Sequence, residues 1–164
     1  MRKYFLGLSL ILIEMTALGQ DFSKKNEIFL ELGGNGLLGS VNYARQLTKN
    51  PGLEFRAGLG AYGSEKTFIT IPVSLNYSIG LGGQHSFLTI GMGATYTKAD
   101  VRMGRIIDYE ESYDHIHSAP INLVPSLAYR YYTTKDFLWK VGFNPVINVH
   151  GFLPSFGLSA GKRF

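Results

Sequence analysis

The chain has 164 residues, no cysteine and a formal net charge of +4. So small a positive surplus gives no reason to expect a nucleic-acid partner, and the absence of cysteine excludes disulfide bonds and a lipid anchor on cysteine. The 20 glycines, 10 tyrosines and 11 phenylalanines argue against a helical fold, because glycine and aromatic residues are poor helix formers.

The first 19 residues are predicted to be a secretory signal peptide. Arg2 and Lys3 precede an apolar run over 4–13, and a small residue stands at Gly19. The run is too short to cross a bilayer as a helix, which takes about 20 apolar residues. Cleavage near Gly19 leaves 20–164 as one domain with its own core. The alternative is an amphipathic helix that the mature protein keeps.

Apolar residues then alternate with small or polar ones in eight stretches. A period of two with one apolar face predicts a β-strand, and most of the stretches are near the ten or so residues that a tilted membrane strand needs. We therefore predict an all-β fold, an eight-stranded antiparallel up-and-down barrel. The predicted strands lie near 28–33, 40–44, 53–61, 69–79, 88–96, 121–132, 137–144 and 152–164.

Glycine-rich turn signals and prolines punctuate these strands. The first turn is the Gly-Gly-Asn-Gly run over 33–36, and it is not a phosphate-binding loop because no helix follows it. Proline removes a hydrogen-bond donor from a β-ladder, so we expect bulges or strand ends at four positions. These are Pro72, Pro125, Pro145 and Pro154.

Two features favour an apolar face that points outward into lipid over a soluble, exported lipocalin-like barrel. The polar face is mostly glycine, serine, threonine, alanine and asparagine, which suit the narrow interior of eight strands. If the amino terminus lies in the periplasm, the short connections at 48–52, 80–84 and 133–136 are periplasmic, and the longest, 98–118, is extracellular.

Aromatic residues near the predicted strand ends also favour the membrane, because girdles of aromatic side chains mark the interfaces of membrane barrels. The predicted girdle residues are Tyr62, Tyr77, Tyr96, Tyr129, Tyr131, Phe137, Trp139 and Phe164.

Strand parity places at least six charged side chains inside the barrel. They must pair or form hydrogen bonds there, because an isolated buried charge is costly. One interpretation is a gate or an ion path, and the other is a structural network of ion pairs that plugs the lumen. Eight strands leave little room for a column of water, which favours the plug. The six residues are Glu31, Glu54, Arg56, Arg130, Lys140 and Arg163.

Three histidines, His115, His117 and His150, fall on the predicted outer rim. One hypothesis is a metal site with nearby acidic residues, and another is a rim histidine and serine that deacylate lipid A. No spacing matches a metal site, and His117-Ser118 lacks the rest of such an enzyme's motif. We therefore predict no metal, cofactor or catalytic residue, and an ordinary solvated loop.

The last strand carries a resemblance to a known family. Phe156, Leu158 and Phe164 share its apolar face, and a terminal strand that ends on an aromatic residue resembles that of outer-membrane barrel proteins. The resemblance implies that these three residues form a signal for the barrel-assembly machinery. Lys162 stands where that signal usually has an apolar residue.

The resemblance extends over the rest of the chain. The run over 31–43, with Ile-Pro-Val at 71–73 and the glycine-rich fifth strand, is similar to small eight-stranded barrels of the OmpA/OmpX type, including uncharacterised ones of Bacteroidetes-type bacteria. This implies an integral outer-membrane protein surrounded by outer-membrane lipid, and the family has no agreed activity to carry over. We predict a structural or interaction role, with an unknown extracellular partner at 98–118. A rim enzyme or a small-ligand transporter is the alternative.

Overall fold

The structure is a computed structural model that describes residues 24–48, 52–63, 67–82, 85–98, 101 and 120–164. The predicted signal peptide and most of the 98–118 connection, including His115 and His117, lie outside these ranges. Within them, no helix has the length and hydropathy needed to cross a membrane.

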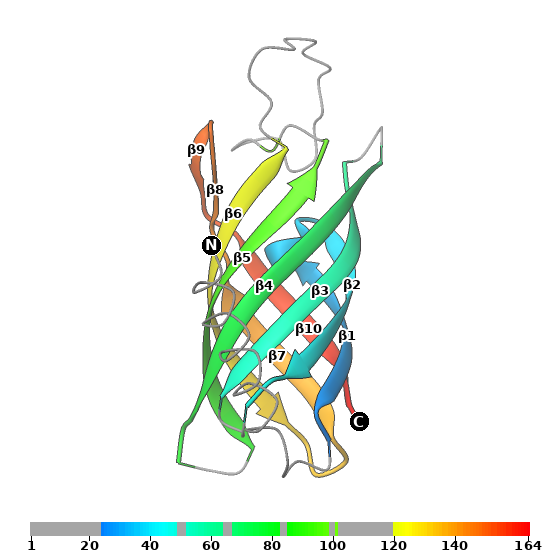
Figure 1. Cartoon of the computed structure of the whole chain (residues 1–164), viewed down its shortest axis with the longest axis vertical. Helices are drawn as coiled ribbons and strands as arrows, with labels where there is room; N and C mark the ends of the chain where they lie inside the picture. The colour runs from blue at the N-terminus through cyan, green and yellow to red at the C-terminus, as the bar shows by residue number, and fades with distance from the viewer. Residues whose placement is uncertain (1–23, 49–51, 64–66, 83–84, 99–100, 102–119) are drawn as a thin grey trace, which may run out of the picture.

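Eight antiparallel strands form a closed barrel, as the sequence predicts (Figure 1). Neighbouring strands pair in chain order from β1 to β7, β10 follows β7, and β10 pairs back with β1 to close the wall. The wall strands are β1 (Asn26–Gly33), β2 (Gly39–Gln46), β3 (Leu53–Tyr62), β4 (Phe68–Gly80), β5 (Ser86–Thr97), β6 (Ile121–Tyr132), β7 (Phe137–Phe143) and β10 (Phe156–Arg163).

The two ends of the barrel differ, and we name them for use below. The base is the end with the carboxyl terminus and the turn between β6 and β7, where the Arg163 amide donates to the Asp136 carbonyl oxygen at 2.9 Å (Figure 1). The far end is the opposite one, where β1 meets β2 and β5 ends.

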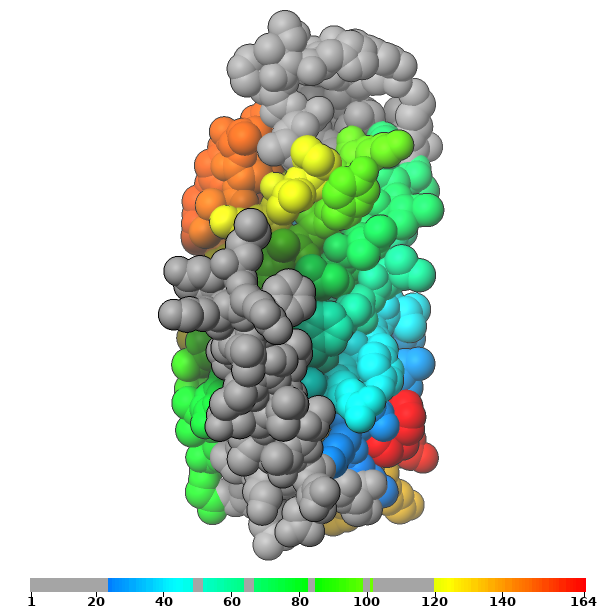
Figure 2. Space-filling model, viewed as in Figure 1, coloured from blue at the N-terminus to red at the C-terminus, as the bar shows by residue number. Residues whose placement is uncertain are grey.

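The wall has an apolar outer face and a mainly polar inner face. On β4, Ile69 and Leu75 are exposed, while Thr70 and Asn76 are buried inside the barrel. The other wall strands alternate in the same way. In the space-filling view, atoms of β2 to β5 form much of the part of the wall that is visible (Figure 2). A soluble lipocalin-like barrel has the opposite arrangement, with its apolar face inside.

The four prolines lie where a ladder is interrupted or a strand ends. Pro72 falls in a gap of the β3–β4 pairing. Pro125 lies in a stretch of β6 that pairs with β5 but with neither β7 nor β8. Pro145 and Pro154 lie between strands. The missing amide donors therefore interrupt few ladder bonds.

The predicted last strand, 152–164, is wrong in its first part. Pro154 and Ser155 separate β10 from a short strand, β9 (Gly151–Leu153), which pairs with β8 (Val146–Asn148). This hairpin continues the edge of β6 through the pair Leu123–Ile147 and stands at the far end of the wall (Figure 1). Pro154 has no amide hydrogen to donate to a ladder, which is consistent with the break between β9 and β10.

The turn between β1 and β2 folds into the barrel. It is a 3₁₀ turn, η1 (Gly34–Gly36), whose three residues are buried, and it lies within the barrel in Figure 1. Gly33 and Gly34 have φ of +70° and +63°, a left-handed conformation that glycine adopts at little cost. The turn predicted at these glycines is present. The sequence analysis did not predict that it points into the barrel.

Candidate functional site: the charged interior

The first buried ion pair joins β6 to β3 near the base. The Nη1 and Nη2 atoms of Arg130 donate to Oε2 and Oε1 of Glu54 at 2.5 and 2.8 Å. Asn76 Nδ2 donates to the same carboxylate at 3.1 Å. The Arg130 and Glu54 side chains are each 1% exposed. Two parallel hydrogen bonds between ionised groups are the strongest form of such a pair.

A second carboxylate, Glu27, adjoins this pair, and the sequence analysis missed it. Tyr132 donates its hydroxyl to Glu27 Oε1, and Arg130 Nη1 lies 3.7 Å from the same oxygen. Within the described residues, Glu27 Oε2 and Arg130 Nε have no hydrogen-bond partner. Glu27 precedes inward-facing Glu31 by an even number of residues, so strand parity was the signal that would have found it.

The second buried ion pair joins β3 to β1. Arg56 donates through Nη1 to Glu31 Oε1 at 3.2 Å and through Nη2 to Oε2. Its Nε atom donates to Asn42 Oδ1 at 3.0 Å, and Ser159 donates to Glu31 Oε1 at 3.4 Å. Both charged groups thus have several partners, which the interior of a protein requires of them.

Two of the six predicted lumen residues differ from the other four. The Lys140 ammonium lies 4.5 Å from the centroid of the Phe29 ring and forms no ion pair with any described residue. Arg163 is at the base, where its Nη2 atom lies 2.9 Å from Asp136 Oδ1 and its guanidinium carbon 4.4 Å from the centroid of the Tyr132 ring.

Asp136 is the acidic partner at the base rim, outside the strands. It accepts hydrogen bonds from Lys24 and Arg163, which hold the pKa of its carboxyl below the usual value, with the Lys24 bond as the larger cause. Asp136 therefore ties the segment before β1 to the end of β10.

Polar groups hold the inward turn η1 against the wall. Thr95 donates to the Asn35 carbonyl oxygen at 2.6 Å, and Thr70 to the Gly36 carbonyl oxygen at 3.1 Å. Asn144 Nδ2 donates to Asn35 Oδ1 at 3.0 Å. Three separate wall segments therefore bond to a turn of three residues.

The far end of the interior holds a cluster of apolar side chains, which we call the far cluster. Its buried members are Leu37, Tyr62, Val101, Val124, Val146 and Leu153. Tyr62 is 3% exposed, so its predicted place in the outer aromatic girdle is wrong. An even position at the end of β3 puts its ring inside, because the outward residues of that strand are odd-numbered.

The other seven predicted girdle residues are exposed on the outer face. His150, the one rim histidine that the structure describes, lies in the turn between β8 and β9. Among the described residues, no group of three or more histidines or acidic residues is placed to hold a metal ion. The described part of the interior thus offers ion pairs and hydrogen bonds.

Comparison with known proteins supports the fold. No protein-family profile matches the chain, and no curated protein matches it. Among solved structures, the N-terminal β-barrel domain of Pseudomonas aeruginosa OprF is similar with a TM-score of 0.59 and 15% identity, over 86% of this chain and 96% of that one. Yersinia pestis outer membrane protein Ail, in a phospholipid bilayer nanodisc, is similar with a TM-score of 0.54 and 14% identity, over 87% of this chain and all of that one (100%).

At these identities the likeness concerns the fold. The chain has the closed antiparallel barrel fold of these two outer-membrane proteins, as its resemblance to small outer-membrane barrels implies.

Proposed function

We propose that this protein is an integral outer-membrane β-barrel. The observation that carries the proposal is the outer face, on which large apolar side chains from every wall strand are exposed. Such a surface far exceeds the apolar patches of soluble monomers, and a closed barrel is one of the two structures that satisfy all backbone groups in lipid. The two similar proteins, one a barrel domain and one studied in a bilayer, support the same placement.

Membrane fractionation and electrophoresis test this placement. We expect the protein in the outer-membrane fraction of its host. A purified sample should change its electrophoretic mobility on boiling in detergent, because a closed barrel stays folded in detergent until it is heated. A protein that stays in the soluble fraction and shows no mobility change would refute the proposal.

We propose further that the lumen is closed to diffusion. Support comes from the two buried ion pairs, Arg56 with Glu31 and Arg130 with Glu54, and from the far cluster, whose side chains are buried at the other end. An eight-stranded interior is only wide enough for its own side chains. Reconstitution in planar bilayers should therefore give no steady single-channel current. Large and stable channels would favour the transporter alternative.

The role that fits a closed barrel is structural or interactive, with the connections at the far end presented outside the cell. The longest connection, 98–118, is the proposed contact with an extracellular partner, although it lies mostly outside the described residues. Deletion of 102–113 should leave barrel assembly intact and abolish capture of that partner. Changed lipid A acylation after His117→Ala would instead favour the rim enzyme.

The terminal strand is the proposed signal for the barrel-assembly machinery. Phe156 and Leu158 on the outer face of β10 are 70% and 60% exposed, and Phe164, which follows β10, is 53% exposed. Another protein can therefore contact all three. Deletion of Phe164 should lower the amount of folded protein in the outer membrane far more than it lowers the stability of barrels already formed. Unchanged outer-membrane levels would contradict this role.

A further inference from the structure

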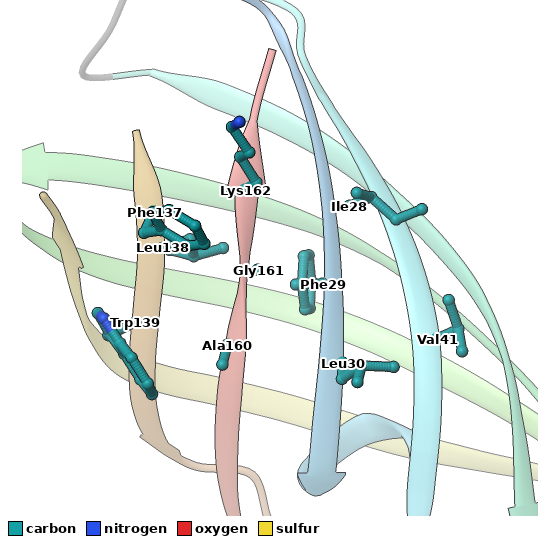
Figure 3. A pocket seen from close by; sticks show the side chains of 10 residues that line it. All are labelled: Ile28, Phe29, Leu30, Val41, Phe137, Leu138, Trp139, Ala160, Gly161 and Lys162. Carbon is teal, nitrogen blue, oxygen red and sulfur yellow. The ribbon is translucent and has the colours of Figure 1, made fainter. Parts of the chain in front are cut away.

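An apolar groove runs along the outer wall over β10, the strand that closes the barrel. Its floor is Ala160 and Gly161, and its sides are Phe137 and Trp139 of β7 and the β1 residues Ile28 and Leu30 (Figure 3). The groove exists because Ala160 stands directly between Trp139 and Leu30 in the strand register. One small side chain between two large ones leaves a channel in the apolar outer surface.

A single cation marks the base end of this groove. Lys162 faces outward between Phe137 and Ile28, with its ammonium 5.7 Å from the centroid of the Phe137 ring. No described acidic residue lies within ion-pair distance of it. The acidic side chain nearest to it in sequence, Asp136, accepts hydrogen bonds from Lys24 and Arg163 instead.

We propose that this groove binds one acyl chain of an anionic phospholipid, whose phosphate pairs with Lys162. The proposal rests on the placement in the outer membrane given above. The apolar channel matches a hydrocarbon chain, and a cation at the interface end matches a negative headgroup. The base end faces the leaflet on the side of the termini, which selects a phospholipid of that leaflet.

A second copy of the chain fits this groove less well than a lipid. Two-fold symmetry places the same patch of both copies face to face, so a dimer across the groove would bring two Lys162 ammonium groups together with no described carboxylate between them. Like charges held close in a poorly hydrated interface repel each other. The unpaired cation therefore argues for an anionic occupant.

Native mass spectrometry of the refolded chain in detergent micelles tests the proposal. Dioleoyl phosphatidylglycerol and dioleoyl phosphatidylcholine are supplied in equal amounts, and the lipids retained per barrel are counted. We expect one phosphatidylglycerol retained in preference to phosphatidylcholine. Lys162→Gln should reduce this preference roughly fivefold, the factor that one basic residue near an anionic lipid surface supplies. Ala160→Phe fills the groove and should abolish retention of either lipid.

Two matched variants serve as controls. Lys135→Gln removes an exposed cation of the base turn, and Ala94→Phe enlarges an outward alanine of β5, away from the groove. Both should bind lipid like the unmodified chain. The proposal would be overturned if the unmodified chain retained the two lipids equally. It would also be overturned if Lys135→Gln lost as much lipid preference as Lys162→Gln, or Ala94→Phe as much retained lipid as Ala160→Phe. A chain that shows no heat-modifiable mobility and does not enter bilayers would overturn the outer-membrane placement as well.

Discussion

The base half and the far half of the interior both hold a cluster of buried apolar side chains, but among the described residues the buried ion pairs lie in the base half. In the base half, Arg130 and Arg56 each bind a carboxylate from another strand. Buried apolar side chains pack in the same half: Phe29, Ala44, Phe87, Tyr132 and Leu138. In the far half, six apolar side chains pack together above the η1 turn. This difference predicts which substitutions in each half lower the free energy of unfolding most. Removing one member of a buried ion pair leaves the other charge buried without a partner, which is strongly destabilising. Truncating a buried apolar side chain costs only its own contacts and the cavity that it leaves.

Breaking the ion pair of the base half should have the largest effect. Arg130→Met leaves Glu54 and Glu27 buried without their cation, and we expect the free energy of unfolding to fall by about 3–5 kcal/mol. Urea titration in lipid vesicles measures it. The double variant with Glu54→Leu should recover part of the loss, because an apolar pair replaces a broken ionic one. A single variant as stable as the unmodified chain would contradict the comparison.

Truncating the far cluster should cost less. Val124 is fully buried (0% exposed), and Val124→Ala should lower the free energy of unfolding by about 1–2 kcal/mol through lost contacts and a small cavity. The matched control is Val141→Ala on the outer face, where the side chain is 47% exposed and the loss should be smaller. Equal losses at the two positions would show that the far cluster is not a packed core.

The η1 turn lies between the two halves, and a substitution at Gly34 tests its packing against the wall. In Gly34→Ala, a Cβ atom would lie 2.7 Å from Glu31 Cδ, at a φ of +63°. A left-handed alanine costs about 1–2 kcal/mol in backbone strain alone. Gly82→Ala is the control, because Gly82 has a φ of +77° but no neighbour within 4 Å. A larger loss of stability at Gly34 in urea titration isolates its contact with Glu31, and equal losses would show that the contact is unimportant.

The smallest effect is expected at the base rim, as a dependence on pH. The bonds from Lys24 and Arg163 lower the pKa of Asp136. The native state therefore favours the ionised form. Its contribution to stability is complete above the unfolded pKa of about 4 and is lost as the pH falls through the lower folded value. The urea midpoint should fall less between about pH 6 and about pH 3 in Asp136→Asn than in the unmodified chain. Asparagine also tolerates the φ of +62° at this position. An identical pH dependence in the two chains would contradict this role.

Strand parity was enough to predict the barrel and most of its two faces. The alternation along β1, β3 and β6 predicts which of their residues face inward. It places Glu31, Glu54, Arg56 and Arg130 on the inner side, where the structure pairs them. Applied consistently, the same rule finds Glu27 and Tyr132 inside and removes Tyr62 from the girdle.

Other features had no signal of this kind. The Gly-Gly-Asn-Gly run predicts a turn, but nothing local sets its direction, because Asn35 is held inside by Thr95 and Asn144 from distant parts of the chain. The β8–β9 hairpin was missed because its strands have three residues each, too few for a period to show. The pairing of each cation with a given carboxylate likewise depends on the register of strands far apart in sequence.

The inward turn also affects where foreign sequence can be inserted into the barrel. Hairpin turns of barrels are common choices, but Asn35 and its neighbours are enclosed by the wall, and added residues there would have to displace bonded side chains. The turn between β8 and β9 differs: residues 149–151 are exposed, and a Cβ atom added at Gly151 would have no neighbour within 4 Å. A peptide tag belongs there, since exposed turns accept insertions at little cost to the fold.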